Sequence, residues 1–323
     1  GRGDPGGARV GITRRPWYGA DATRPVSSLA GVTMSVVVLI AYAIGVGLGL
    51  LAARSTRFGM VWPAIVRTQI LVAAIALSIV AVWRIDNVDS VLWPLLMALA
   101  MALMFFIAWL TARGPNRDAH AALQTWAANA NTAFFVIPVG AALGGSAGAL
   151  AAVLMDRLAT PLYAFWVWLL RRGAPRQQRR RTSFIDQAPV IALGVGLLLH
   201  LTGPAPAWTA TVTLWAVPLL AASGAAIFIG SVLHHTQRID PRPGIRRWLA
   251  LVGVRIALLM PIAVLAPTLS LRVVALLCAL SIPAFAAPQV STIYGYADPV
   301  VAAGSRYGWF FGAAGLAAAL VIT

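Results

Sequence analysis

The sequence has little charge and almost no cysteine. Only 11% of its 323 residues are charged, whereas 60% are hydrophobic, and the single cysteine is Cys278. One cysteine within an apolar run excludes an internal disulfide and a cysteine-based metal site. No glycine-rich loop of the ATP-binding kind is present, so ATP-driven transport would need a partner chain. We therefore expect neither a metal nor another cofactor.

Long apolar runs are the main feature of the chain. Several exceed about 18 residues, the length at which a membrane-spanning helix becomes the default interpretation. The formal net charge of +16 does not indicate nucleic-acid binding, because the basic residues are all arginines and lie mostly in short loops between apolar runs. The sequence thus predicts an all-α polytopic membrane protein without a nucleic-acid partner.

Ten apolar segments follow one another in two groups of five. Residues 1–30, rich in glycine, proline and arginine, are expected to form a disordered tail that need not belong to the native protein. Residues 31–170 hold the first five segments, residues 171–185 form a basic loop, and residues 186–323 hold the other five. The segments are 32–53, 61–83, 91–112, 123–143, 147–170, 189–202, 211–233, 249–267, 273–293 and 300–322.

The arginines are distributed unevenly among the loops. Arginine-rich loops follow the first, third, fifth and seventh segments, and the loops between them are poor in arginine. Because such loops stay on the cytoplasmic side, both termini are expected outside the membrane. The 171–185 loop could also bind anionic membrane lipid, although topology control already explains its charge.

Two segments are interrupted by proline and polar residues. The fourth contains NANTAFFVIPVGAALGGSAG (129–148), and the ninth lies within ALSIPAFAAPQVSTIYGYADP (279–299). Pro138 lacks a backbone donor and clashes with the preceding turn, which predicts a break or kink there. Buried amides and freed backbone groups are tolerated inside protein or beside a water-filled cavity. Transporters place their substrates at such broken helices.

The two interruptions occupy matching positions in the two halves. When Pro138 is aligned with Pro288, Gly145 falls on Gly295, and the segment that follows each glycine begins in register. An odd number of segments per half makes the halves enter the membrane from opposite sides. The sequence thus predicts two inverted five-helix repeats whose broken helices, the fourth and the ninth, cross near the membrane midplane.

The crossing predicts a binding site for a small organic anion. Half-helix N-termini carry partial positive charge and unpaired N–H groups, which suit a carboxylate. The candidate substrate-binding residues, of which Asn131 is favoured, are Asn129, Asn131, Thr132, Pro138, Pro283, Pro288, Gln289 and Ser291. Two plainer interpretations stay open: prolines can be simple kinks, and asparagines can join helices for only ~0.6 kcal/mol each.

Several charged residues lie within apolar segments. Asp156 and Arg306 fall on equivalent positions of the two halves. They predict either a structural ion pair or a role in coupling, with Asp156 as a proton carrier. Arg67 and Arg255 lie about two turns from the cytoplasmic face and are expected to snorkel there as anchors.

The sequence GGSAG (144–148) fits the G-x-S-x-G pattern of serine hydrolases, with Ser146 as the nucleophile. That motif requires a strand-to-helix elbow with a histidine and an acid nearby. Here it joins two membrane segments, so an intramembrane hydrolase is the weaker alternative and the chain is not expected to be an enzyme.

The chain resembles the auxin efflux carrier family of permeases, which includes bacterial malate and malonate carriers. The resemblance covers nearly all of residues 32–323, and the two proline-containing crossings are its specific part. It rests on Asn131-Thr132, Ile137-Pro138, Met155-Asp156, APVIALGVGLLLHLTG (188–203), IPAFAAP (282–288) and YGYADP (294–299). The chain departs from the family at Arg306, where relatives are usually apolar. It also lacks the asparagine that many relatives carry in the ninth segment.

The resemblance implies a ten-helix inverted-repeat fold, shared in outline with bile-acid sodium symporters. Helices one, two, six and seven would form a scaffold that is often dimeric. Helices three to five and eight to ten would carry the substrate by an elevator-like movement. Asn131, Pro138, Pro283 and Pro288 would frame the site.

These observations favour a secondary transporter that moves a small organic anion, expected to be a carboxylate, by alternating access across the plasma (inner) membrane of a bacterium. A homodimer is expected. A sodium-coupled symporter of the bile-acid type is the main rival, and it would need carboxylates and exposed carbonyls gathered at the crossing. A receptor or scaffold without transport activity is a third possibility.

Overall fold

The computed structural model describes residues 29–114, 116–174, 188–235 and 239–323. Within these ranges every regular element is a helix, which confirms the predicted all-α class. The predicted tail, apart from its last two residues, and most of the predicted basic loop lie outside the described residues.

The helices follow the predicted segments closely. They are α1 (Leu29–Arg54), α2 (Thr56–Trp83), α3 (Asp89–Thr111), α4 (Arg117–Ala128), the π-helical turn η1 (Thr132–Val136), α5 (Ile137–Leu158), α6 (Thr160–Gly173), α7 (Ala188–Thr202), α8 (Thr209–His235), the 3-10 turn η4 (Arg242–Gly244), α9 (Ile245–Leu265), α10 (Leu269–Ala279), α11 (Ala286–Tyr294), α12 (Pro299–Tyr307) and α13 (Trp309–Ile322). The fourth and ninth predicted segments are each divided by a break.

The described part of the chain is that of a multi-pass membrane protein. Five helical stretches are long and apolar enough to cross a membrane, and a sixth crossing results if the bent pair α12 and α13 counts as one span. Large apolar side chains on these stretches, such as Leu39 of α1 (65% exposed) and Leu110 of α3 (59% exposed), suit contact with lipid. Ten crossings and the direction of the termini stay predictions.

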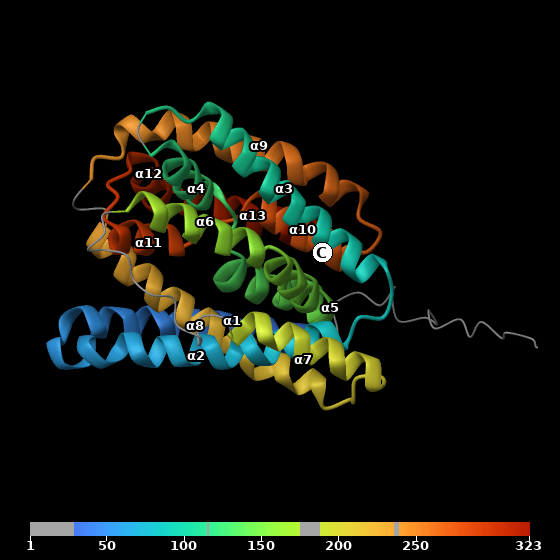
Figure 1. Cartoon of the computed structure of the whole chain (residues 1–323). Helices are drawn as coiled ribbons and strands as arrows, with labels where there is room; N and C mark the ends of the chain where they lie inside the picture. Colours follow the sequence, from blue (N-terminus) through green and yellow to red (C-terminus); the bar gives the residue numbers. More distant parts are fainter. Residues whose placement is uncertain (1–28, 115, 175–187, 236–238) are drawn as a thin grey trace, which may run out of the picture.

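The helices form three layers (Figure 1). Helices α1, α2, α7 and α8 pack on one another as a four-helix layer. Helices α3 and α9 lie on the opposite side, and α4 to α6 with α10 to α13 fill the space between. The main buried core lies where α5 packs against α10. The four-helix layer contains the four helices that the resemblance predicts to form a scaffold.

Helix α5 reverses direction at Gly145, where the backbone is not helical (φ 63°, ψ −157°). Thr132 donates a hydrogen bond to the Asp156 carboxylate across 24 positions, which a straight helix would separate by about 36 Å. A Cβ added at Gly148 would lie 2.3 Å from the Gly140 carbonyl oxygen. The residues on either side of Gly145 therefore form an antiparallel helical hairpin, as the turn between the fourth and fifth predicted segments requires.

A second reversal lies at Gly295 (φ 73°), between α11 and α12. Ser291 Oγ donates to the Tyr296 carbonyl oxygen within this turn. After the reversal the chain runs back beside the break that follows α10, because a Cβ at Gly308 would lie 2.0 Å from Pro283 Cδ. Both broken segments are thus followed by a left-handed glycine turn and a returning helix.

Candidate functional site

The two breaks lie against each other in the middle layer. Helix α4 ends at Ala128 and α10 ends at Ala279, and residues 129–131 and 280–285 follow in non-helical conformations. We call these two stretches the crossover. Ala130 and Pro283 form an antiparallel β-bridge. The Asn131 N–H donates to the Ile282 carbonyl (2.9 Å), and the Ala284 N–H donates to the Asn129 carbonyl (3.1 Å). The two interrupted segments therefore cross at their breaks, running antiparallel.

The sequence predicted the break of the fourth segment at Pro138. The observed break lies upstream of this proline, at residues 129–131. Pro138 stands in the first turn of α5, a position that needs no backbone donor. In a regular helix an N–H at position 138 would bond to the Phe134 carbonyl. That carbonyl accepts a hydrogen bond from Tyr42 Oη of α1 instead (2.7 Å). The proline therefore begins the helix after the break and does not cause the break by itself.

The two asparagines of the crossover are buried and incompletely bonded. Asn131 caps η1, since its Oδ1 accepts from the Phe134 N–H (3.3 Å), and its Nδ2 has no partner in the described structure. Asn129 is fully buried, and neither side-chain atom has a partner there. A buried amide without hydrogen bonds costs about 1–3 kcal/mol. Two such amides at one break indicate a place where a polar ligand or water completes the hydrogen bonding.

A buried charged pair lies next to the asparagines. Asp156 accepts from Thr132 Oγ1, which follows Asn131 directly, and its other oxygen is 3.2 Å from Arg157 Nη2. The predicted pairing of Asp156 with Arg306 is wrong, because Arg306 is exposed on α12. The adjacent arginine reaches the carboxylate from its own helix, whereas the repeat-related position faces outward. Asp156 therefore joins the two legs of the α5 hairpin beside the crossover.

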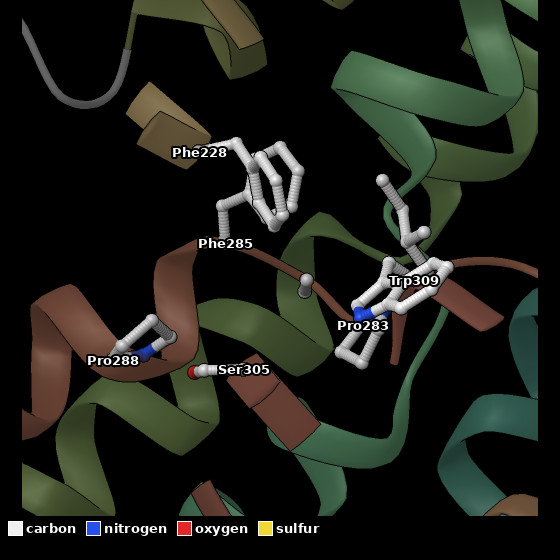
Figure 2. Close-up of a pocket in the computed structure, with 8 residues that line it drawn as sticks. Phe228, Pro283, Phe285, Pro288, Ser305 and Trp309 are labelled. Atoms are coloured by element: carbon white, nitrogen blue, oxygen red, sulfur yellow. The ribbon is translucent and has the colours of Figure 1, made fainter. Parts of the chain in front are cut away.

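The candidate residues of the ninth segment divide into two groups. Pro283 and Pro288 are buried and line a small apolar cavity of about 10 Å³, roughly room for one water molecule (Figure 2). Gln289 is exposed, and Ser291 uses its hydroxyl in the Gly295 turn. Neither of these predicted site residues is hydrogen-bonded to the side chains of Asn129 or Asn131 in the described structure.

An aromatic cluster separates the crossover from the four-helix layer. Phe285 stacks on Phe134 of η1 (centroids 6.3 Å apart) and packs on Phe228 of α8 (5.0 Å). Phe228, Phe285 and Trp309 lie around the small cavity in Figure 2. This cluster could not be predicted from the sequence, because aromatic residues in apolar segments carry no signal that distinguishes lipid-facing from buried positions. The ring contacts of Phe285 thus join the crossover to α8.

Arg255 is the largest departure from the sequence-based prediction. It was expected to snorkel toward the cytoplasm, yet it is 2% exposed and its side chain points into the crossover. Its Nε, Nη1 and Nη2 donate to the carbonyl oxygens of Ala279 (3.0 Å), Ala128 (2.8 Å) and Ser281 (2.9 Å). The prediction was wrong because distance along α9 says nothing about which face of the helix carries the side chain. A buried guanidinium therefore meets the ends of both broken helices.

A second polar network lies at the opposite end of α4. Asp298 caps α12 by accepting from the Val300 N–H (2.8 Å), and it also accepts from His120 Nδ1 (2.9 Å) and Gln124 Nε2 (3.2 Å). The hydrogen bond that His120 donates to Asp298 raises the pKa of His120, and partial burial opposes this effect. Arg247 of α9 extends the network by donating to Gln124 Oε1 (2.6 Å). The network joins α4, α9 and the loop before α12.

Ser146 lies in the turn of the α5 hairpin. It is exposed and directly follows the left-handed Gly145. The motif thus joins two antiparallel helical legs, and the strand-to-helix elbow that activates a nucleophilic serine is not formed around it. Among the described residues, no group of three or more His, Cys, Asp or Glu side chains is placed to hold a metal ion.

Comparison with models of known protein families and with curated proteins gives no match for this chain.

Proposed function

We propose that the chain is a secondary transporter that moves a small organic anion, expected to be a carboxylate, through the crossover by alternating access. One observation carries the proposal: two interrupted helices cross at their breaks, and the buried amides of Asn129 and Asn131 lie there without full hydrogen bonding. Broken helices that meet inside a membrane protein are the usual setting of transporter binding sites. Irregular backbone at such depth is tolerated where it lines a site or is buried in protein.

The hydrogen bonding at the crossover argues against sodium. Arg255 donates to the carbonyl groups that end α4 and α10. A sodium ion would need exposed carbonyl oxygens, and those of Ala128, Ala279 and Ser281 are already bonded to this guanidinium. We therefore favour an organic anion carrier over the sodium-coupled alternative.

The inverted repeat and the resemblance to auxin efflux carriers belong to the same proposal. Asn131 and Ser281, which bond across the crossover, are 150 positions apart, and the left-handed glycines Gly145 and Gly295 share that spacing. Antiparallel pairing at the breaks is what a two-fold relation in the membrane plane would produce. We propose ten crossings in two inverted five-helix repeats, with both termini outside a bacterial inner membrane.

Alternating access would move the middle layer against the four-helix layer, which we propose to be the scaffold and the dimer interface. Such movement must break the packing of α1, α2 and α8 against η1 and α5. The contacts that would be broken include the Tyr42 hydrogen bond to the Phe134 carbonyl and the packing of Phe228 on Phe285.

Purified protein in liposomes provides the test. Uptake of radiolabelled mono- and dicarboxylates is measured with and without a pH gradient, and we expect saturable uptake of at least one acid. Asn131→Ala should lower that uptake about tenfold or more, because a site built to hydrogen-bond its ligand loses strongly when a partner is removed. Thr211→Ala, whose hydroxyl is exposed on α8, is the matched control and should transport like the parent.

Two outcomes would reject the proposal. The first is the absence of flux for every acid in a protein that is monodisperse and thermally stable. The second is an Asn131→Ala protein with the same transport kinetics as the Thr211→Ala control. If uptake instead requires sodium and is independent of pH, the sodium-coupled alternative replaces the one favoured here.

A further inference from the structure

We propose that Arg255 is the positioning residue of the crossover: its guanidinium joins the C-terminal ends of the two broken helices and thereby sets the backbone that presents Asn129 and Asn131. The effect on transport rests on the function proposed above, whereas the effect on the crossover itself does not. Arg255 lies on α9, outside both interrupted segments, so it holds them from a third element.

The guanidinium donates hydrogen bonds to three backbone carbonyls. Nη1 bonds to Ala128, the last residue of α4, and Nε bonds to Ala279, the last residue of α10. Nη2 bonds to Ser281, and the Ser281 hydroxyl oxygen accepts from the Asn131 N–H (3.1 Å). Arg255 is thus bonded to the residue directly before Asn129 and, through one intermediate residue, to Asn131.

The charge of Arg255 is balanced by helix dipoles. Within the described part of the chain no carboxylate lies at ion-pair distance from Arg255. A helix C-terminus carries roughly half a negative charge, so the ends of α4 and α10 together offset about one positive charge. Carbonyls left unbonded at two buried helix ends would each be costly. The guanidinium therefore stabilises both ends, and both ends stabilise the buried guanidinium.

Arginine is needed here because of its shape. Its planar head directs five N–H donors outward in a fixed fork, whereas lysine offers a compact ammonium on a flexible stem. Three carbonyls that come from two helices and a loop match the fork. Lysine would keep the charge but could not hold all three carbonyls in their present positions.

The native cysteine allows the role of Arg255 to be tested without any transport assay. Cys278 is the only cysteine, is fully buried, and directly precedes Ala279 in the last turn of α10. We expect N-ethylmaleimide to label it slowly in the folded full-length protein in lipid nanodiscs. Arg255→Met should raise the labelling rate about tenfold or more, because α10 loses the bond at its end, and Arg255→Lys should raise it by about threefold.

Arg272→Met is the matched control. Arg272 also donates from Nε to a single backbone carbonyl, that of Ala266 (2.8 Å), but its side chain is exposed and lies at the other end of α10. The control should label at the parental rate. Labelling of folded Arg255→Met at that same rate would overturn the proposal. If Arg255→Met does not fold, Arg255→Lys decides, and a parental labelling rate for it would overturn the proposal equally.

Uptake kinetics on the same variants separate positioning from general stability. Where the parent transports an acid, Arg255→Lys should raise KM about tenfold with a smaller change in kcat, since the asparagines are displaced. If Arg255→Lys is labelled fast but has an unchanged KM, Arg255 holds the helix ends without positioning the asparagines. That result would refute the positioning role. If the parent transports nothing, the proposed function fails, while the labelling comparison still decides whether Arg255 holds the crossover.

Discussion

The reversal of α5 at Gly145 can be tested by adding one methyl group at position 148. Gly148 packs so closely on the first leg of the hairpin that an added Cβ would lie 2.3 Å from the Gly140 carbonyl oxygen. That oxygen belongs to the backbone and cannot rotate away, so Gly148→Ala must push the two legs apart. Overpacking of this kind costs about 1–3 kcal/mol. We expect Gly148→Ala to lower the free energy of unfolding by that amount.

Gly253→Ala supplies the control for helix propensity. Gly253 lies within α9, and nothing is within 4 Å of a Cβ added there. Alanine favours a helix by about 1 kcal/mol over glycine, so this variant should be as stable as the parent or more stable. The two variants should differ by about 2–4 kcal/mol, which corresponds to roughly 3–6 °C in apparent Tm.

The assay is thermal unfolding in one detergent at one scan rate, followed by tryptophan fluorescence, because membrane proteins commonly unfold irreversibly. If residues 132–173 formed one straight helix, Gly148 would face no backbone and both alanines would be harmless. Equal Tm values for the two variants would therefore refute the hairpin, and with it the placement of Thr132 beside Asp156.

Three further outcomes are expected. Asp156→Asn should destabilise the protein by about 3–5 kcal/mol, because Arg157 is left unpaired in a largely buried position, and adding Arg157→Gln should restore much of the loss. Thermal unfolding of the single and double variants checks this, and additive losses would contradict it. Asp298 raises the pKa of His120, so their contact should stabilise the fold fully below about pH 6.5 and less as the pH rises through the folded pKa of His120. The Tm difference between the parent and His120→Gln should therefore shrink from pH 5.5 to 8.5. A constant Tm difference would disprove this prediction. Tyr42→Phe removes the donor to a carbonyl that Pro138 leaves without its helical partner, and should lower stability by about 1 kcal/mol in chemical unfolding, whereas an unchanged midpoint would show that this carbonyl is satisfied otherwise.

The positions of the helices could be predicted because they depend on local properties. Apolar runs near the membrane length, and loops rich in arginine, place helix ends to within a few residues: the predicted segment 91–112 is α3 (Asp89–Thr111). The glycine turns were also predictable, since Gly145 and Gly295 adopt positive φ values that other residues rarely adopt. Breaks in the fourth and ninth segments followed from proline and amide content.

The composition of the site could be predicted only in part. Asn129 and Asn131 lie in the crossover and Thr132 directly follows it, whereas Gln289 is exposed and Ser291 bonds within a turn. The break itself depends on pairing between Ala130 and Pro283, which are distant in sequence. Proline marks a place where a helix can begin as well as one where it ends, so Pro138 alone could not locate the break.

The sequence by itself determined that this is a membrane protein, which stretches are helical, and which two helices are interrupted, since hydropathy and missing backbone donors act over one or two turns. Only the tertiary structure decided that the interruptions pair with each other, that Asp156 joins Arg157 and Thr132, and that Arg255 turns inward to both helix ends. The physical reason is that a buried polar group takes whichever partner the packing brings within about 3 Å, and that choice depends on helices far away in the chain.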